Sequence, residues 1–139
     1  MPQVAPSLDP GLPRPAYHCG RLMAVLAEAQ RSALGDVGAS VVQRYYAAAS
    51  ATPALVFGRL VRGAQFHLAK MKGDQPFYYE RVLGEVTQAI GASMPPTPDL
   101  EGQTLFALGY YHQLLALRTN RQQDTNSEAN TESNHEENV

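Results

Sequence analysis

The chain has a single cysteine, Cys19, and lacks any long uninterrupted apolar run. One cysteine cannot form a disulfide within the chain, which favours a reducing compartment. A membrane-spanning helix needs roughly 18 to 20 apolar residues in succession, and the first 15 residues carry prolines and an aspartate where a secretory signal would be basic and then apolar. The sequence therefore predicts a soluble, cytoplasmic protein with no membrane contact.

Signatures of enzymes and metal sites are also missing. The four histidines and Cys19 follow no CxxC, HxxxH or HExxH spacing, and the glycines do not form a phosphate-binding loop. His18 and Cys19 are adjacent, and consecutive residues on a helix point in different directions, so they cannot form a nucleophile–base pair. Cys19 could pair with His67 or His112, but a lone cysteine in a helix is usually a small core residue. We expect no catalytic activity, cofactor or metal.

Acidic residues are scarce in the first half of the chain and basic residues are missing from its end. Residues 1–121 hold all 11 Lys and Arg against 8 Asp and Glu, while residues 122–139 hold 5 acids and no base. Between Arg14 and Lys72, 8 basic residues face only Glu28 and Asp36. This basic half is able to attract a polyanion.

Apolar residues recur at intervals of three and four, which predicts helices and no sheet. We expect an all-α fold, a single five-helix bundle over residues 16–118, after a Pro-rich, extended leader (1–15) and before a disordered polar and acidic tail (119–139). The predicted helices span residues 16–34, 40–49, 52–72, 75–90 and 97–118. The second segment has strand-like residues too, but no partner strand of similar composition exists.

Start and stop signals support these bounds. Gly35 and Gly91 stand where a helix C-cap glycine belongs, and Ser40 is a candidate N-cap. Thr52-Pro53 and Thr97-Pro98 predict helix starts. In the fourth helix, the apolar stripe predicted to pack on the bundle consists of Tyr79, Val82, Leu83, Val86 and Ile90. In the fifth helix, the corresponding stripe consists of Leu105, Leu108, Tyr111 and Leu115.

The third predicted helix has two distinct faces. At 100° per residue, a basic face collects Arg59, Arg62, Phe66 and Lys70. The opposite face, predicted to pack on the bundle, collects Phe57, Leu60, Val61, Ala64, Leu68 and Met71. No acid lies between Thr52 and Gly73, so the usual neutralising partners at i,i+4 are missing.

Two interpretations of the basic face remain open. An aromatic ring among cations suits stacking on an unpaired base, whereas it equally suits a protein contact, and charge on an exposed helix face is common. We predict nucleic-acid binding through Arg59, Arg62, Phe66 and Lys70. The weaker candidates are Lys72, Arg44, Arg21 and Arg31.

Four stretches in order resemble the C-terminal helical region of the type I-C CRISPR large subunit. They read AYHCGRLMAVLAEAQ, RYYAAASATPALVFGRLVRGAQFHLAKM, YYERVLGEVTQAI and LFALGYYHQ, within residues 15–113. The several hundred upstream residues of the large subunit, including the part that recognises the protospacer-adjacent motif, have no counterpart here. The sequence begins with methionine, as would a small subunit translated from inside the large-subunit gene; a truncated large subunit is the alternative.

The resemblance implies a non-catalytic small subunit of an RNA-guided CRISPR surveillance complex (Cascade). Its partners would be the large subunit, the backbone subunits and other copies of itself, together with guide RNA and target DNA, chiefly the displaced strand. Such subunits help to hold unwound DNA, and a separately recruited helicase-nuclease cuts it. Because guide pairing selects the sequence, the contacts should go to backbone and shape. The alternative is a structural spacer that contacts only proteins.

Overall fold

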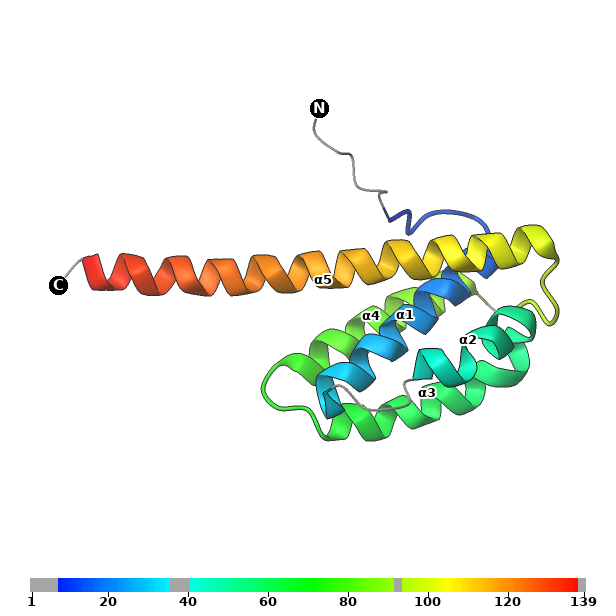
Figure 1. Cartoon of the computed structure of the whole chain (residues 1–139), viewed down its shortest axis with the longest axis horizontal. Helices are drawn as coiled ribbons and strands as arrows, with labels where there is room; N and C mark the ends of the chain where they lie inside the picture. Colours follow the sequence, from blue (N-terminus) through cyan, green and yellow to red (C-terminus); the bar gives the residue numbers. More distant parts are fainter. Residues whose placement is uncertain (1–7, 36–40, 92–93, 138–139) are drawn as a thin grey trace, which may run out of the picture.

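The computed structural model describes residues 8–35, 41–91 and 94–137, and places side chains in residues 8–35, 44–91 and 94–119. Within these ranges the helices are α1 (Pro15–Leu34), α2 (Val41–Ala51), α3 (Pro53–Ala69), α4 (Gln75–Ile90) and α5 (Leu100–Glu137) (Figure 1). No strand occurs in the part of the chain that the structure describes. The predicted all-α fold is confirmed.

Helix α1 lies at the centre of the bundle and packs against each of the other four helices. Every residue from Ala16 to Leu26 is buried, and a helix that is buried all round needs neighbours on all sides. α5 lies along one side of α1, and α3 lies on the other (Figure 1), while the rings of Phe57 on α3 and Phe106 on α5 meet in the core with their centroids 6.4 Å apart. The outward faces of α3 and α5 are therefore separate surfaces.

Two glycines let α1 and α5 approach closely. A Cβ atom on Gly20 would overlap the backbone carbonyl of Phe106, and one on Gly109 would overlap that of Tyr17. Neither obstacle is a flexible side chain that could turn away. The crossing of these two helices thus depends on glycine at both positions.

The predicted ends of the helices are right in part. Gly35 and Gly91 take positive φ angles at the ends of α1 and α4, as predicted. Thr52, however, precedes α3 without capping it, because its hydroxyl donates to the carbonyl of Ala48. The predicted start of the fifth helix at Thr97 is also wrong: α5 begins at Leu100, where the carboxylate of Asp99 accepts the N–H of Gly102 at 2.8 Å.

Two further predictions differ from the structure, and a third concerns a residue that the structure does not describe. Helix α3 ends at Ala69, short of the predicted residue 72. The described part of the leader is not simply extended, because the carbonyl of Asp9 accepts the N–H of Leu12 in a turn. Ser40 lies outside the described residues.

The backbone of α5 continues as a helix to Glu137 and passes beyond the other four helices (Figure 1). The disorder expected from residue 119 stays a prediction.

The core faces of α3 and α4 are as predicted, but that of α5 is wrong. Leu108 is 44% exposed and Tyr111 is 60% exposed, so they point away from α1. The side of α5 that faces the bundle carries instead Gly102, Phe106, Gly109, Gln113 and Leu117, all buried. Hydrophobic periodicity selected the wrong side because three of these five residues are glycine or glutamine.

This assignment predicts opposite outcomes for two leucine substitutions. Leu60→Ala should lower the free energy of unfolding by about 2 to 5 kcal/mol, since Leu60 lies in the core. Leu108→Ala should change it by about 0.5 kcal/mol or less, as at other surface positions. Urea denaturation followed by circular dichroism measures both. Equal losses for the two variants would contradict the assignment of the α5 faces.

Candidate nucleic-acid interface

The outward face of α3 carries the predicted basic residues. Arg59, Arg62, Phe66 and Lys70 are all exposed, and Phe66 is 73% exposed. On the opposite face Phe57, Leu60, Ala64 and Leu68 are buried, while Val61 and Met71 are half-buried. Helical periodicity alone was sufficient here because the cations all lie on one face and the opposite face is wholly apolar. We call Arg59, Arg62, Phe66 and Lys70 the basic face.

The cations of the basic face are free of acidic partners within the described residues. The Arg62 Nε–H donates to the carbonyl of Gly58 one turn earlier, at 3.2 Å, which holds the side chain along the helix. No ion pair joins Arg59, Arg62 or Lys70 to a carboxylate in the part of the chain that the structure describes. Their charge is therefore available to an external anion.

Sequence reasoning missed residues that border this face. Leu55 is 82% exposed, and it precedes Arg59 by four residues, a spacing that already places the two on one side of a helix. Arg59 also borders a recess of about 220 Å³ whose lining includes Tyr45 from α2 and His67 from α3. Burial, and then the charge of Lys70, lower the pKa of His67, so its ring adds no charge to the recess at neutral pH.

The weaker candidates lie in different places. Lys72 is exposed in the connector after α3, and Arg44 is exposed on α2. Arg31 is exposed in the last turn of α1, where it lies 3.6 Å from the carboxylate of Glu28. The structure thus groups Arg59, Arg62, Phe66 and Lys70 on one helix face, whereas Lys72, Arg44 and Arg31 lie on other elements, apart from that face.

The prediction of Arg21 as a weaker nucleic-acid contact is corrected by the structure, because its side chain is buried rather than exposed to solvent. It is 4% exposed. Its Nε–H donates to the Gln113 side chain at 2.9 Å, and its Nη1–H donates to His18 Nδ1 at 2.8 Å. A charge count along the chain could not reveal this, since it ignores that α1 is covered on all sides. Arg21 is out of reach of a polyanion strand.

Two glycines flank the basic face in the interior of α3. A Cβ atom on Gly58 or Gly63 would meet nothing within 4 Å, so neither glycine is needed for packing among the described residues. Glycine inside a helix lowers stability by roughly 0.5 to 1 kcal/mol relative to alanine. Close approach of another molecule's backbone to α3 would explain the choice.

We expect Gly58→Ala and Gly63→Ala each to raise the free energy of unfolding by about 0.5 to 1 kcal/mol, because alanine favours the helix and fills open space. Each should at the same time weaken binding of single-stranded DNA. Gly84→Ala on α4, also open around its Cβ, is the matched control and should stabilise without affecting DNA binding. Denaturation and fluorescence anisotropy measure the two effects; stabilisation with unchanged DNA affinity would remove the glycines from the interface.

Cys19 lies in the hydrophobic core, with none of its surface exposed. Burial raises the pKa of its thiol to about 12, so the thiol stays protonated at neutral pH. His112, one of its possible partners, has its Nδ1 hydrogen-bonded to the Tyr17 hydroxyl at 2.8 Å. No group of three or more His, Cys, Asp or Glu positioned to hold a metal occurs in residues 8–35, 41–91 and 94–137.

The described residues thus form an all-helical bundle with an exposed basic face on α3. None of the described helices is both long and apolar enough to cross a membrane. The family described as CRISPR-associated protein (Cas_Csd1) matches residues 2–118, so the chain belongs to that family. This agrees with the resemblance carried by the four helical stretches. No match was found among curated proteins.

Proposed function

We propose that this protein is a non-catalytic small subunit of a type I-C RNA-guided complex that holds nucleic acid through the basic face of α3. The observation that carries the proposal is the exposed set of three cations without acidic partners within the described residues. Membership of the CRISPR-associated family supports it. In such a complex the expected ligands are the guide-paired target DNA and, chiefly, the displaced strand.

The geometry favours backbone contacts over base reading. Arg59 and Lys70 lie 11 residues apart, or about 16 Å along a helix with a rise of 1.5 Å per residue. Cations in such a row can neutralise successive phosphates, which is independent of sequence. Phe66 lies between them and offers a ring on which an unpaired base can stack. Guide pairing supplies the sequence selection, so the subunit itself needs none.

A structural spacer is the second candidate function, and one observation favours it. Leu55 and Phe66 are 82% and 73% exposed on the same side of α3, and exposed apolar residues beside arginines are typical of protein interfaces. In that function α3 would pack on the large subunit, a backbone subunit or another copy of this chain. We place the protein in the cytoplasm in either case and assign it no catalytic step.

A titration of single-stranded DNA into the isolated protein separates the two functions. We expect weak, sequence-independent binding, roughly micromolar or weaker at physiological salt, with an affinity that falls steeply as salt rises. Fluorescence anisotropy with two unrelated sequences at several salt concentrations measures it. A spacer would show no binding even at low salt, and strong preference for one sequence would contradict a backbone-holding subunit.

A further inference from the structure

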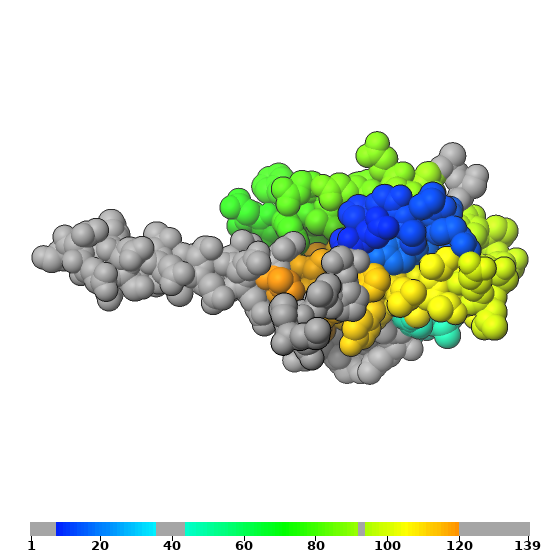
Figure 2. Space-filling model, turned by 90° about the horizontal axis from the view of Figure 1, so that it is seen from above, coloured from blue at the N-terminus to red at the C-terminus, as the bar shows by residue number. Residues whose placement is uncertain are grey.

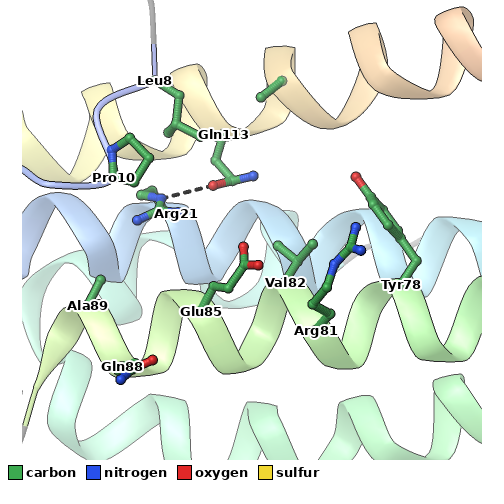
Figure 3. Close-up of a pocket in the computed structure, with 11 residues that line it drawn as sticks. Leu8, Pro10, Arg21, Tyr78, Arg81, Val82, Glu85, Gln88, Ala89 and Gln113 are labelled. Carbon is green, nitrogen blue, oxygen red and sulfur yellow. Dashed lines mark hydrogen bonds between the residues drawn. The ribbon is translucent and has the colours of Figure 1, made fainter.

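A pocket lies on a part of the bundle that α3 does not reach. The described end of the leader runs between α4 and α5 (Figure 2), and the cavity beneath it has a volume of about 500 Å³, within the range typical of ligand sites. Its lining comes from the leader, α1, α4 and α5 (Figure 3): Leu8, Pro10, Arg21, Tyr78, Arg81, Val82, Glu85, Gln88, Ala89, Gln113 and Ala116.

Arg21 is the unusual group in this lining, because it is a buried cation. No ion pair of Arg21 occurs among the described residues; burial lowers the pKa of its guanidinium, while Tyr17, Glu85 and Asp9 nearby oppose that shift. Its partners are neutral: Gln113 and His18 accept from it. These two hydrogen bonds use two of the five N–H groups of the guanidinium, and the Arg21 side chain lines the pocket.

A chain of hydrogen bonds fixes the direction of the guanidinium. Because arginine can only donate, His18 must accept at Nδ1, which leaves its Nε2–H to donate to the carbonyl of Leu12 at 2.6 Å. Burial, opposed in part by the hydrogen bond to Leu12, lowers the pKa of His18, in keeping with a neutral ring. The leader and α5 thereby hold Arg21 from two sides, with its remaining donors oriented in advance.

Two cations and one carboxylate line the pocket, and Asp9 on the leader lies near enough to favour the charged form of Arg21. Arg21 and Arg81 are cationic and Glu85 is anionic among the lining residues. Arg81 also lies over the Tyr78 ring, 5.6 Å from its centroid. Aliphatic surface from Leu8, Val82 and Ala116 forms much of the remaining wall. Such a site suits a carboxylate group on a short apolar stem.

We propose that this pocket binds a carboxylate, held end-on by the Arg21 guanidinium, with its aliphatic stem against the apolar wall. A guanidinium and a carboxylate match in a two-pronged hydrogen-bonded pair. A free dicarboxylic acid and the glutamate side chain of a neighbouring polypeptide both carry this chemistry. A phosphodiester strand is a poorer match, because it needs an open row of cations rather than one recessed guanidinium.

NMR titration of the full chain tests this site, with the Arg21 Nε–H and the Gln113 side-chain amide as reporters. The probes are glutarate, the peptide acetyl-Ala-Glu-Ala-amide, neutral glutaramide and dimethyl phosphate. We expect saturable shifts of both reporters with glutarate or with the peptide, and none with glutaramide. Tighter binding of glutarate indicates a free acid as the ligand, and tighter binding of the peptide indicates a polypeptide.

Variants on the exposed side of α4 test the charge argument without disturbing the core. Glu85→Gln should tighten carboxylate binding about threefold and Arg81→Gln should weaken it about threefold, as expected for one unit charge near the surface. Glu80→Gln removes an acid from the same helix outside the pocket and should have little effect. The proposal is overturned if no carboxylate probe binds even to Glu85→Gln, if glutaramide binds equally well, or if dimethyl phosphate binds more tightly than both carboxylates.

Discussion

Gly109→Ala should destabilise the protein by about 3 kcal/mol or more, the upper part of the range for overpacking. The added methyl group would overlap the backbone carbonyl of Tyr17 on α1, and neither helix can yield without moving its other contacts. Because small domains are stable by only about 5 to 15 kcal/mol, such a loss is a large share of the total. Thermal and urea denaturation followed by circular dichroism measure it.

Gly84→Ala is the matched control for this prediction. It makes the same chemical change inside a helix, but its Cβ would meet nothing within 4 Å, so it should stabilise by about 0.5 to 1 kcal/mol. Gly20→Ala, which would overlap the Phe106 carbonyl from the other side of the crossing, should resemble Gly109→Ala. A Gly109→Ala protein with the parent melting temperature would show that α1 and α5 lie further apart than described.

The sequence predicts those elements whose apolar residues are large and regularly spaced. In α4 the predicted stripe of Tyr79, Val82, Leu83, Val86 and Ile90 is buried in full. In α5 the same method selects the wrong side, because the inner face relies on Gly102, Gly109 and Gln113. Glycine contributes to packing there by its small size, which a hydrophobic pattern does not register.

The candidate interface could be predicted where it occupies one helix and not where it depends on tertiary structure. Helical geometry places Arg59, Arg62 and Lys70 together, and all three are exposed. Burial of Arg21 depends on the packing of α5 over α1, which no local pattern encodes. The pocket is built from four separate segments of the chain, so it likewise cannot be predicted from local sequence patterns.

Replacing Arg59, Arg62 and Lys70 together with alanine should reduce the magnitude of the log-log salt slope for single-stranded DNA by about 2. The reason is counterion release: each phosphate contact on a single strand contributes about 0.7 to that slope. Folding should persist, because the three side chains are exposed and alanine has high helix propensity. Circular dichroism verifies the fold, and fluorescence anisotropy at several salt concentrations measures the slope.

Phe66→Ala is the comparison variant for the triple alanine variant, because it removes an aromatic ring and no charge. If the ring stacks on a base, its loss should weaken binding by about 1 to 3 kcal/mol and leave the salt slope unchanged, since no charge is removed.

In a reconstituted RNA-guided complex the triple variant should assemble but hold unwound DNA less stably, because guide pairing remains intact. Failure to assemble would favour the spacer, in which α3 contacts protein. Unchanged affinity, slope and unwinding in a folded triple variant would contradict the proposed interface and move the search to the exposed cations Arg31, Arg44 and Lys72.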